Sequence, residues 1–405
     1  METARTNTDG FAYLVKISPD SNNNRYYRMI AQGDAFLIEM GRIGATPVTS
    51  RRPMMLWDTT LKRKLAEGYE DRSALCRVDI EKESKYGKIS DRDVRTLVDT
   101  LQRYANVMLD ETYSVSYQDV SQSMIDEAQE LIYQISEHQN DLDICRENFK
   151  KLFVVIPRKM KNVQEMLPKK ADDIPVMLLR EQDILDVMTA KISQSSTVTE
   201  NSSKATVLDS LGLDIRLCTS EENMQIKRFL SKESSLYFKR AFRVVNHKTE
   251  LQFQNYMENR GLDNRDIHYL YHGSRNANYY GLMSEGPRLN PKAPINGKMF
   301  GHGIYFAPRA KKSIGYTDIL GSRWVNGNSL QAFLAVYKVV YHNQMDVSVW
   351  SAEMPGYTKS KIAPYDAVFA HKGISLFNDE VIIYDENQIT VQYLIELEYK
   401  EQEHE

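Results

Sequence analysis

One stretch, residues 269–316, constrains what this chain can fold into and do more than any other. The apolar run from Tyr269 to Tyr271 leads into His272-Gly273-Ser274, and this pattern predicts the end of a β-strand. A glycine-flanked segment, from Gly301 to Phe306, predicts a loop that enters a second strand. Rigid scaffolds commonly present polar groups of this kind beside β-type runs, so we expect a functional site here.

Two further segments extend this pattern. Ser313 and Tyr316 have the spacing of neighbours on one helix face, and Asn378-Asp379-Glu380 opens a strand-like run. Taken singly, each residue is more often structural. A histidine can simply end a strand, a serine can cap a helix, a glutamate can lie at a strand edge, and the chain has 24 tyrosines. Only the combination favours a functional role.

Composition bounds the class of protein. The 405 residues are enough for two or three domains, and 42% apolar with 26% charged residues is ordinary for a globular protein. No apolar run approaches the length of a membrane span, and the first residues lack a signal-peptide core. We therefore expect an intracellular protein, nuclear in a eukaryote and cytoplasmic or nucleoid-associated in a bacterium. Cys76, Cys145 and Cys218 are widely spaced, which predicts reduced thiols and no metal site.

The first 80 residues predict a small antiparallel sheet with one helix across it. Phe11–Lys16, Tyr26–Ile30 and Phe36–Met40 have the pattern of strands, and Met55–Glu67 has that of a helix closed by Gly68. From residue 42 to residue 64, six basic residues stand against one acid. A solvated charged face is the commoner meaning of such a run. The functional alternative is a local phosphate-contacting surface, because the net charge of −3 gives no global sign of nucleic-acid binding.

Residues 88 to about 190 predict a helical bundle. Ser114 or Ser116 is the expected cap of its second helix, and further helices are predicted over Cys145–Val155 and Glu181–Ala190, separated by Ile156–Pro175. Two apolar stripes recur at three or four residues and are expected in the core: Val94, Leu97, Leu101, Tyr104, Met108, and Val120, Met124, Ala128, Leu131, Ile135.

The remaining chain is predicted to be β-rich after a polar linker over residues 192–206. Strands are predicted over Ala332–Val340, Val381–Tyr384 and Thr390–Tyr399. The fold class is therefore multidomain α+β: a small antiparallel sheet plus helix, an all-α bundle, and a mixed β-rich fold. No GxGxxG follows a first strand, so a Rossmann dehydrogenase is not supported.

These residues together resemble the catalytic domain of the poly(ADP-ribose) polymerases, and the whole chain resembles a DNA-dependent member. His272, Tyr305 and Glu380 match the family's histidine–tyrosine–glutamate signature. The flanking sequence segments HGS, FGHGIYF, KKSIGY and NDEVIIYD match as well. A match in three parts is much more specific than a single short motif.

The resemblance implies three domains. These are a WGR-like DNA-binding domain over residues 1–84, a helical regulatory domain over 85–195, and an ADP-ribosyltransferase catalytic domain over 196–405. It implies NAD⁺ as the substrate, consumed as an ADP-ribose donor, with no metal. It also implies protein acceptors, including the chain itself, and activation by DNA breaks that relieves a block by the helical domain. We expect a monomer without membrane contact.

The resemblance also assigns the site. Glu380, His272 and Tyr305 are the implied catalytic residues, and Glu380 stabilises positive charge that develops on the ribose, as in glycoside hydrolysis. Gly273 grips the carboxamide by its backbone, and Tyr305 and Tyr316 stack on the ring. The implied NAD⁺-binding residues are Gly273, Ser274, Asn278, Arg288, Gly303, Lys312, Ser313 and Tyr316.

The implied DNA contacts lie in the first domain: Met40, Gly41, Arg42, Arg51 and Arg52. Met40-Gly41-Arg42 stands where WGR domains carry tryptophan-glycine-arginine, and methionine offers apolar contact without a flat ring. Four positions on the acceptor side also depart from well-known members: Lys298, His302, Asn378 and Asp379.

Two other functions remain open from the sequence. The chain can be a mono-ADP-ribosyltransferase whose acceptor loops do not support elongation. It can also be a non-catalytic binder of DNA ends or NAD⁺, although the intact histidine–tyrosine–glutamate set argues against this.

Overall fold

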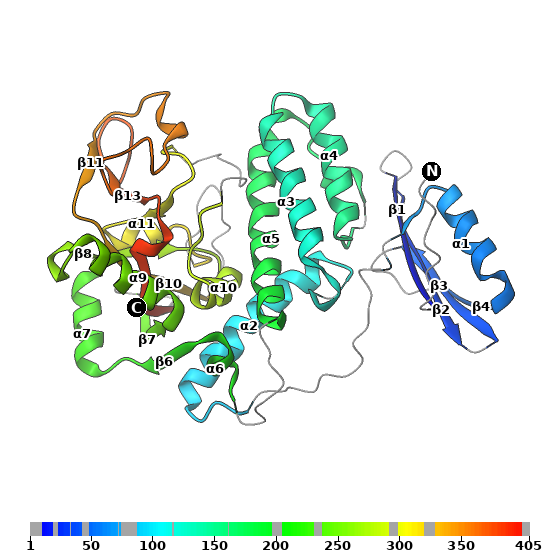
Figure 1. The fold of residues 1–405 in the computed structure, drawn as a ribbon, viewed down its shortest axis with the longest axis horizontal. Helices are drawn as coiled ribbons and strands as arrows, with labels where there is room; N and C mark the ends of the chain where they lie inside the picture. The colour runs from blue at the N-terminus through cyan, green and yellow to red at the C-terminus, as the bar shows by residue number, and fades with distance from the viewer. Residues whose placement is uncertain are drawn as a thin grey trace, which may run out of the picture. The chain divides into compact units, whose positions relative to one another are not determined.

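The computed structural model describes residues 10–18, 23–32, 34–42, 48–71, 73, 87–115, 117–160, 162–196, 205–230, 237–290, 299–319 and 329–398. The chain forms two compact units, Met1–Glu83 with Val107–Ile192, and Ser84–Asn106 with Ser193–Glu405. Helix α2 (Arg92–Thr112) contributes residues to both units (Figure 1). The predicted division into three domains stays a prediction, because this grouping by contacts does not test it.

The first unit contains a five-stranded antiparallel sheet in the order β4-β3-β2-β1-β5. The three predicted strands are confirmed as β1 (Phe11–Ser18), β2 (Asn23–Gln32) and β3 (Ala35–Arg42). The predicted helix is a 3₁₀ turn (Met54–Leu56) followed by α1 (Trp57–Ala66). Two strands were not predicted, β4 (Val48–Pro53) and β5 (Glu70–Asp71). The first carries arginines and a proline, as edge strands often do, and the second has two residues.

Alternation along β3 defines which face of this sheet is buried. Phe36 and Ile38 are buried, and Phe36 packs edge-on against Trp57 of α1 at 5.2 Å between ring centroids. Met40 shares their face because it lies two residues farther along the strand, yet it is 37% exposed. The covered part of this face therefore ends before Met40.

The helices of the first unit pack around apolar stripes. They are α3 (Gln122–Glu137), α4 (Leu142–Val155), α5 (Ile174–Ser196) and the second part of α2. The predicted stripe of α3 is confirmed, since Val120, Met124, Ala128, Leu131 and Ile135 are all buried. In the α2 stripe Val94, Leu97 and Leu101 are buried, whereas Tyr104 and Met108 are partly buried.

Three local predictions for these helices were wrong or lie outside the described residues. Ser121, not Ser114, stands at the N-cap of α3, and the Ser114 hydroxyl donates to the Pro157 carbonyl at 3.1 Å. Ser116 lies outside the described residues. Helix α5 begins seven residues before the predicted start, because Pro175 lies in its first turn, where a missing N–H costs nothing. The same helix continues through Ser196, into the predicted linker, of which residues 197–204 are not described.

The second unit is built on two sheets. The larger has the order β6-β7-β14-β10-β8 and is antiparallel throughout. The smaller has the order β11-β12-β13-β9, with one parallel pair, β11 and β12. The strands of the larger sheet are β6 (Leu213–Leu217), β7 (Phe238–Asn246), β8 (Ile267–Gly273), β10 (Gln331–Val340) and β14 (Ile389–Glu398). Those of the smaller are β9 (Ile304–Phe306), β11 (Gln344–Val347), β12 (Ala367–Ala370) and β13 (Glu380–Ile383).

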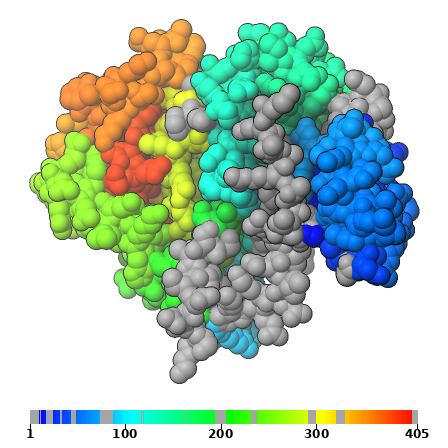
Figure 2. Space-filling view, turned by 45° about the vertical axis from the view of Figure 1, so that its right-hand side comes forward, coloured from blue at the N-terminus to red at the C-terminus, as the bar shows by residue number. Residues whose placement is uncertain are grey.

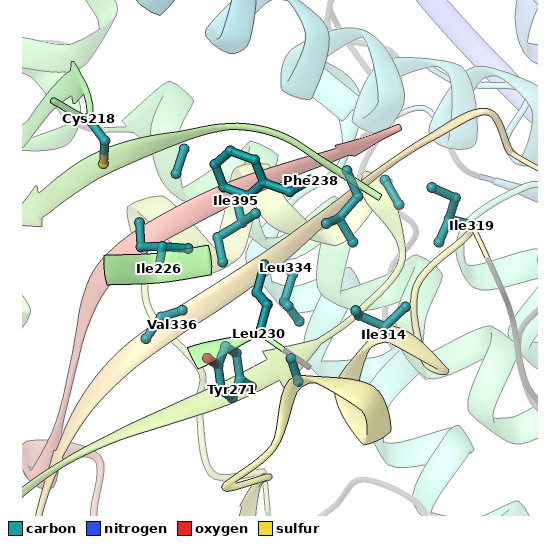
Figure 3. Packing of buried hydrophobic residues seen from close by; sticks show 14 residues of the cluster. Cys218, Ile226, Leu230, Phe238, Tyr271, Ile314, Ile319, Leu334, Val336 and Ile395 are labelled. Atoms are coloured by element: carbon teal, nitrogen blue, oxygen red, sulfur yellow. The ribbon is translucent and has the colours of Figure 1, made fainter. Parts of the chain in front are cut away.

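Short helices cover these sheets. They are α6 (Val207–Leu211), α7 (Ser220–Phe229), α9 (His247–Arg260), α10 (Tyr279–Ser284) and α11 (Ala310–Ile314). The core of the larger sheet joins α7 and α11 to the central strands: Ile226 and Ile314 pack in one cluster with Leu334, Val336 and Ile395 (Figure 3). Figure 2 shows how the green, yellow, orange and red segments of this unit form one continuous surface.

The two sheets of the second unit meet at one point. Tyr271 of β8 and Ala307, just after β9, exchange both main-chain hydrogen bonds at 2.9 Å. The edge of the larger sheet is thereby fastened to the edge of the smaller one. The strands and helices agree with an α+β fold. Among the described residues, no helix has the length and apolar character needed to cross a membrane.

Candidate active site

The end of β8 presents backbone groups at the junction of the sheets. Along a strand, the N–H and C=O of successive residues point to alternate edges. The N–H and C=O groups of Tyr271 form hydrogen bonds with Ala307, on the side of β8 away from β10. Gly273 lies two residues farther along β8, so its N–H and C=O groups point to that same side, beyond the hydrogen bonds between Tyr271 and Ala307. A carboxamide has an NH₂ group that donates and a carbonyl oxygen that accepts, so it can match this edge.

Position 273 accepts only glycine. A Cβ atom there would lie 1.8 Å from the Ser313 carbonyl oxygen, so β8 and α11 pack main chain against main chain. The Ser313 side chain strengthens the same contact, since its buried hydroxyl donates to the Tyr271 carbonyl at 3.1 Å. Ser313 is thus no helix cap, and its oxygen can still accept a second hydrogen bond.

His272 is held in one tautomer by its neighbour. Its Nδ1 lies 3.0 Å from the Tyr305 carbonyl oxygen, which can only accept, so Nδ1 carries the proton. Burial lowers the pKa of His272, although the hydrogen bond to Tyr305 acts in the opposite direction. The neutral ring then offers Nε2 as a hydrogen-bond acceptor, suited to a sugar hydroxyl.

Tyr305 forms a fixed aromatic wall. Its hydroxyl donates to the Gly301 carbonyl and accepts from the Phe300 N–H, both at 2.9 Å. Burial raises the pKa of Tyr305 well above its ordinary value. In register, Tyr305 of β9 lies opposite Ile382 of β13, so its side chain shares a face with that residue and with Glu380 two positions earlier.

Glu380 is paired with a lysine of α11. The Lys312 ammonium forms an ion pair with the Glu380 carboxylate, and the two side chains are only 13% and 14% exposed. Burial lowers the pKa of Lys312, while the carboxylate acts against this shift. Breaking such a shielded pair leaves one charge without compensation, so each partner fixes the position of the other.

Tyr316 lies near the same carboxylate but outside the helix. Helix α11 ends at Ile314, so the predicted sharing of one helix face with Ser313 was wrong. A turn continues the helix, and the Tyr316 N–H donates to the Ser313 carbonyl at 3.1 Å. Burial raises the pKa of Tyr316, and Glu380 adds to the shift. The ring is 39% exposed and is available to stack on a ligand.

The residues implied to hold the adenosine side follow β8. Asn278 donates to the Ser274 hydroxyl at 2.8 Å, and the Ser274 N–H donates to the Tyr279 hydroxyl at 3.1 Å. Arg288 forms an ion pair with Glu285 and is 48% exposed, so it is not brought into the central group. Gly303 has a packing role, since a Cβ there would lie 2.1 Å from Ile382 Cγ2.

One supporting residue was not predicted. Tyr279 is fully buried, and its hydroxyl accepts from the Ser274 N–H and also lies 3.4 Å from the His272 carbonyl. It thereby fixes the turn on both sides of Gly273. No signal in the sequence distinguishes this tyrosine from its neighbour Tyr280.

The donor set of the site consists of hydrogen-bonding and aromatic groups. The clustered groups are one imidazole, one carboxylate, one ammonium, phenols and backbone amides, which suit a carboxamide, a ring and a ribose. Among the described residues, no group of three or more His, Cys, Asp or Glu side chains can hold a metal ion. Cys145 and Cys218 are free and buried, and burial raises the pKa of Cys218 to about 12. Cys76 lies outside the described residues.

The residues implied to contact DNA lie in the first unit, on β3 and β4. Met40, Arg42 and Arg52 share the face that α1 partly covers, because Arg52 pairs opposite Phe36. Arg51 pairs opposite Leu37 and points to the other face. Its guanidinium lies 4.0 Å from the Asp34 carboxylate. Gly41 is also on that second side of β3. Lys298, on the acceptor side, lies outside the described residues.

Part of the chain is similar in sequence to known proteins. The family described as Poly(ADP-ribose) polymerase catalytic domain matches residues 220–324. "Uncharacterized protein 101L" of Invertebrate iridescent virus 6 is 31% identical over 158 residues, covering 38% of this chain and 66% of that protein. "Poly [ADP-ribose] polymerase" of Drosophila melanogaster is 34% identical over 158 residues, covering 34% and 16%. "Poly [ADP-ribose] polymerase 2" of Homo sapiens is 30% identical over 161 residues, covering 33% and 27%.

The geometry of the site and the family match concern the same part of the chain. Residues 220–324 are similar to the catalytic domain of the poly(ADP-ribose) polymerases. The chain spans less than two thirds of the length of the relatives named above. The family match includes His272, Tyr305 and Ser313 but ends before Glu380. The assignment of Glu380 therefore depends on its position in the structure.

Proposed function

We propose that this chain is an NAD⁺-dependent poly(ADP-ribosyl)transferase that modifies protein acceptors, itself included, and releases nicotinamide. One observation carries the proposal: the Glu380 carboxylate, held by Lys312, lies on the same sheet face as Tyr305, whose carbonyl holds His272. An acid, an aromatic wall and a neutral imidazole are thus linked at one junction. We propose polymer rather than single-unit transfer because a glutamate occupies this position.

The residues divide the work of binding and bond cleavage. Gly273 grips the carboxamide through its N–H and C=O, and the Ser313 hydroxyl accepts a third hydrogen bond. Tyr305 and Tyr316 stack on the nicotinamide ring. His272 accepts a hydrogen bond from a ribose hydroxyl at Nε2. Ser274, Asn278 and Arg288 bind the adenosine and pyrophosphate side, where the Arg288 guanidinium is suited to a phosphate.

Glu380 acts on the charge that develops during the reaction. The bond between nicotinamide and ribose breaks heterolytically, and the electron pair leaves with nicotinamide. The ribose carbon becomes positive, so a carboxylate that accepts the neighbouring 2′-hydroxyl stabilises it. The acceptor oxygen then bonds to this carbon and loses its proton. One preorganised electrostatic contact of this kind is worth about 10²–10³ in kcat.

The test compares labelled products of the wild-type chain and Glu380→Gln. The wild type should release nicotinamide from NAD⁺ and build a ladder of labelled polymer on itself. The variant should lose the ladder while it still binds nicotinamide. Glu258→Gln, an exposed glutamate of α9, is the matched control. Equal polymer from the wild type and Glu380→Gln would dismiss the proposal, and single labelled units would favour the mono-transferase.

We further propose that DNA breaks activate the chain through its first unit and that helix α2 restrains the site. Support comes from contacts within the second unit. Asp93 of α2 and buried Glu396 of β14 both bind Arg240 at 2.5 Å. Tyr104 donates to Gln331 at 3.1 Å. The double variant Asp93→Asn, Tyr104→Phe should raise activity in the absence of DNA. Unchanged DNA-free activity in a folded variant would contradict the restraint.

The remaining proposals follow from the same assignment. We propose that the chain acts as a monomer within the cell, in the nucleus of a eukaryote or in the cytoplasm or nucleoid of a bacterium. Sedimentation of the active enzyme tests the first statement, and microscopy of the tagged chain tests the second.

A further inference from the structure

A short turn before β9, Met299 to Gly301, is held by hydrogen bonds from several directions. The Tyr384 hydroxyl donates to the Phe300 carbonyl. The Trp350 indole N–H donates to the Met299 carbonyl at 3.1 Å. The other face of the turn bears on Tyr305, through the two hydrogen bonds of its phenol described above. The turn therefore stands between two external donors and the aromatic wall of the site.

Packing prevents this turn from relaxing. Phe300 and Tyr384 are buried in one apolar cluster beneath the smaller sheet. Gly301 has a φ of +74°, and a Cβ there would lie 2.5 Å from the Tyr357 carbonyl oxygen. The Gly301 backbone is thus closely packed against the Tyr357 main chain. The Trp350 and Tyr384 donors restrict the rest of the turn, because they hold the carbonyls of Met299 and Phe300 in place.

We propose that Tyr384 and Trp350 form a clamp that positions Tyr305 for stacking on nicotinamide. The clamp consists of these two donors and the turn they hold. It rests on the proposed function, since it concerns the same site. Tyr384 does not touch the substrate, so it is a positioning residue. It also follows directly on β13, the strand that begins with Glu380, so one strand anchors both the carboxylate and the clamp.

The clamp predicts a particular kinetic signature. Stacking on Tyr305 is made when NAD⁺ binds, before the bond breaks. Loss of its preorganisation weakens ground state and transition state alike, which raises KM and leaves kcat nearly unchanged. A purely structural role would instead lower the fraction of active enzyme and leave KM as it was.

The experiment replaces Tyr384 with Phe in the full chain. The substitution removes one hydroxyl and leaves the Phe300 carbonyl buried without that donor. We expect the Kd for nicotinamide, measured by calorimetry, and the KM for NAD⁺ to rise about tenfold, the effect of one buried hydrogen bond. The value of kcat should stay within about threefold. An unchanged Kd, or a loss confined to kcat, would overturn the clamp.

Controls separate this inference from the proposed function. Tyr341→Phe makes the same change at a buried tyrosine that stacks on His268 at 3.9 Å and whose hydroxyl forms no hydrogen bond with the described residues. Its Kd should equal that of the wild type, and a tenfold rise there would overturn the clamp. If Tyr384→Phe does not fold, Trp350→Phe tests the other donor of the clamp, a residue that is 39% exposed. A rise of about threefold supports the clamp, and the wild-type value overturns it. A wild-type chain that binds no nicotinamide contradicts the proposed function itself.

Discussion

Lys312 is the residue that gives Glu380 its orientation. The two side chains form a shielded ion pair, and each is less than one sixth exposed. In Lys312→Met the carboxylate loses its cation and is free to rotate away from the ribose. We expect kcat to fall about tenfold to a hundredfold, and the free energy of unfolding to fall by roughly 3 kcal/mol. Steady-state kinetics and urea unfolding measure the two effects.

The neighbouring lysine provides the control for this prediction. Lys311 precedes Lys312 on α11 and is exposed. Lys311→Met also replaces one lysine of α11 by methionine and removes one positive charge, but it leaves the pair of Lys312 and Glu380 in place. Comparable losses in the two variants would show that overall charge, and not the orientation of Glu380, controls the rate.

His272 predicts a dependence on pH. Burial lowers its pKa below the ordinary value of about 6.5, so the unfolded chain binds a proton more readily than the folded chain. Stability should therefore decrease as the pH falls through about 6.5. Activity should decrease as the folded ring gains a proton, because Nε2 then ceases to accept. Burial also lowers the pKa of His268, which contributes in the same direction.

The measurement compares unfolding free energies at pH 7.5 and pH 5.5. In His272→Gln the difference between the two conditions should shrink, and the part due to His268 should remain. An identical difference in the wild type and the variant would remove His272 as a source of the pH dependence.

Single residues could be predicted from the sequence only where they belonged to a pattern. His272, Tyr305 and Glu380 stand in recognisable words, and the structure links them through Tyr305 and β13. Tyr279 stands in no motif, and Tyr384 lies in NDEVIIYD, which assigned it no role. Their importance comes from hydroxyls that reach backbone carbonyls and amides brought near by folding, which periodicity does not encode.

At the scale of elements, the contact between β8 and α11 depends on one missing side chain. Gly273→Ala would place Cβ 1.8 Å from the Ser313 carbonyl oxygen and force the strand and helix apart. We expect the free energy of unfolding to drop by about 1–3 kcal/mol, as in other overpacked sites, and nicotinamide binding to be lost. Thermal unfolding and calorimetry measure the two results.

Gly373 is the matched control for this substitution. A Cβ atom at that position meets nothing within 4 Å, so Gly373→Ala should leave stability and binding close to the wild type. If both alanine variants bind nicotinamide equally, close packing at Gly273 is not what shapes the carboxamide site.

Elements with a strong local pattern could be predicted, and those defined by context could not. β10 and β14 are long apolar runs and were placed within one residue of their observed starts. The start of α5 was missed because Pro175 was interpreted as a separator, although the first turn of a helix tolerates proline. Tyr316 was assigned to a helix that ends two residues earlier, since spacing alone cannot locate a helix end.

For the whole molecule, the sequence predicted a mixed α+β chain, and its division into three domains stays a prediction. Residues 84–106 belong to the compact unit that contains the candidate site, and the rest of the helical region belongs to the other unit. The reason is specific contacts of α2, such as Asp93 with Arg240, that hydrophobic periodicity cannot reveal. Helix α2 therefore contributes residues to both units.

The last prediction concerns the DNA-binding role proposed for the first unit. Each arginine that neutralises one phosphate contributes about −0.9 to the slope of log Kd⁻¹ against log salt. Arg42 and Arg52 share the face of exposed Met40, whereas Arg51 points to the opposite face. The double variant Arg42→Gln, Arg52→Gln should reduce the slope for nicked duplex DNA by about 1.8. Arg51→Gln should leave the slope unchanged, because a duplex bound over Met40 does not reach the other side of the sheet. If each arginine lowered the salt slope equally in the two variants, DNA phosphates would contact both faces of the sheet. The duplex would then not be bound mainly over Met40.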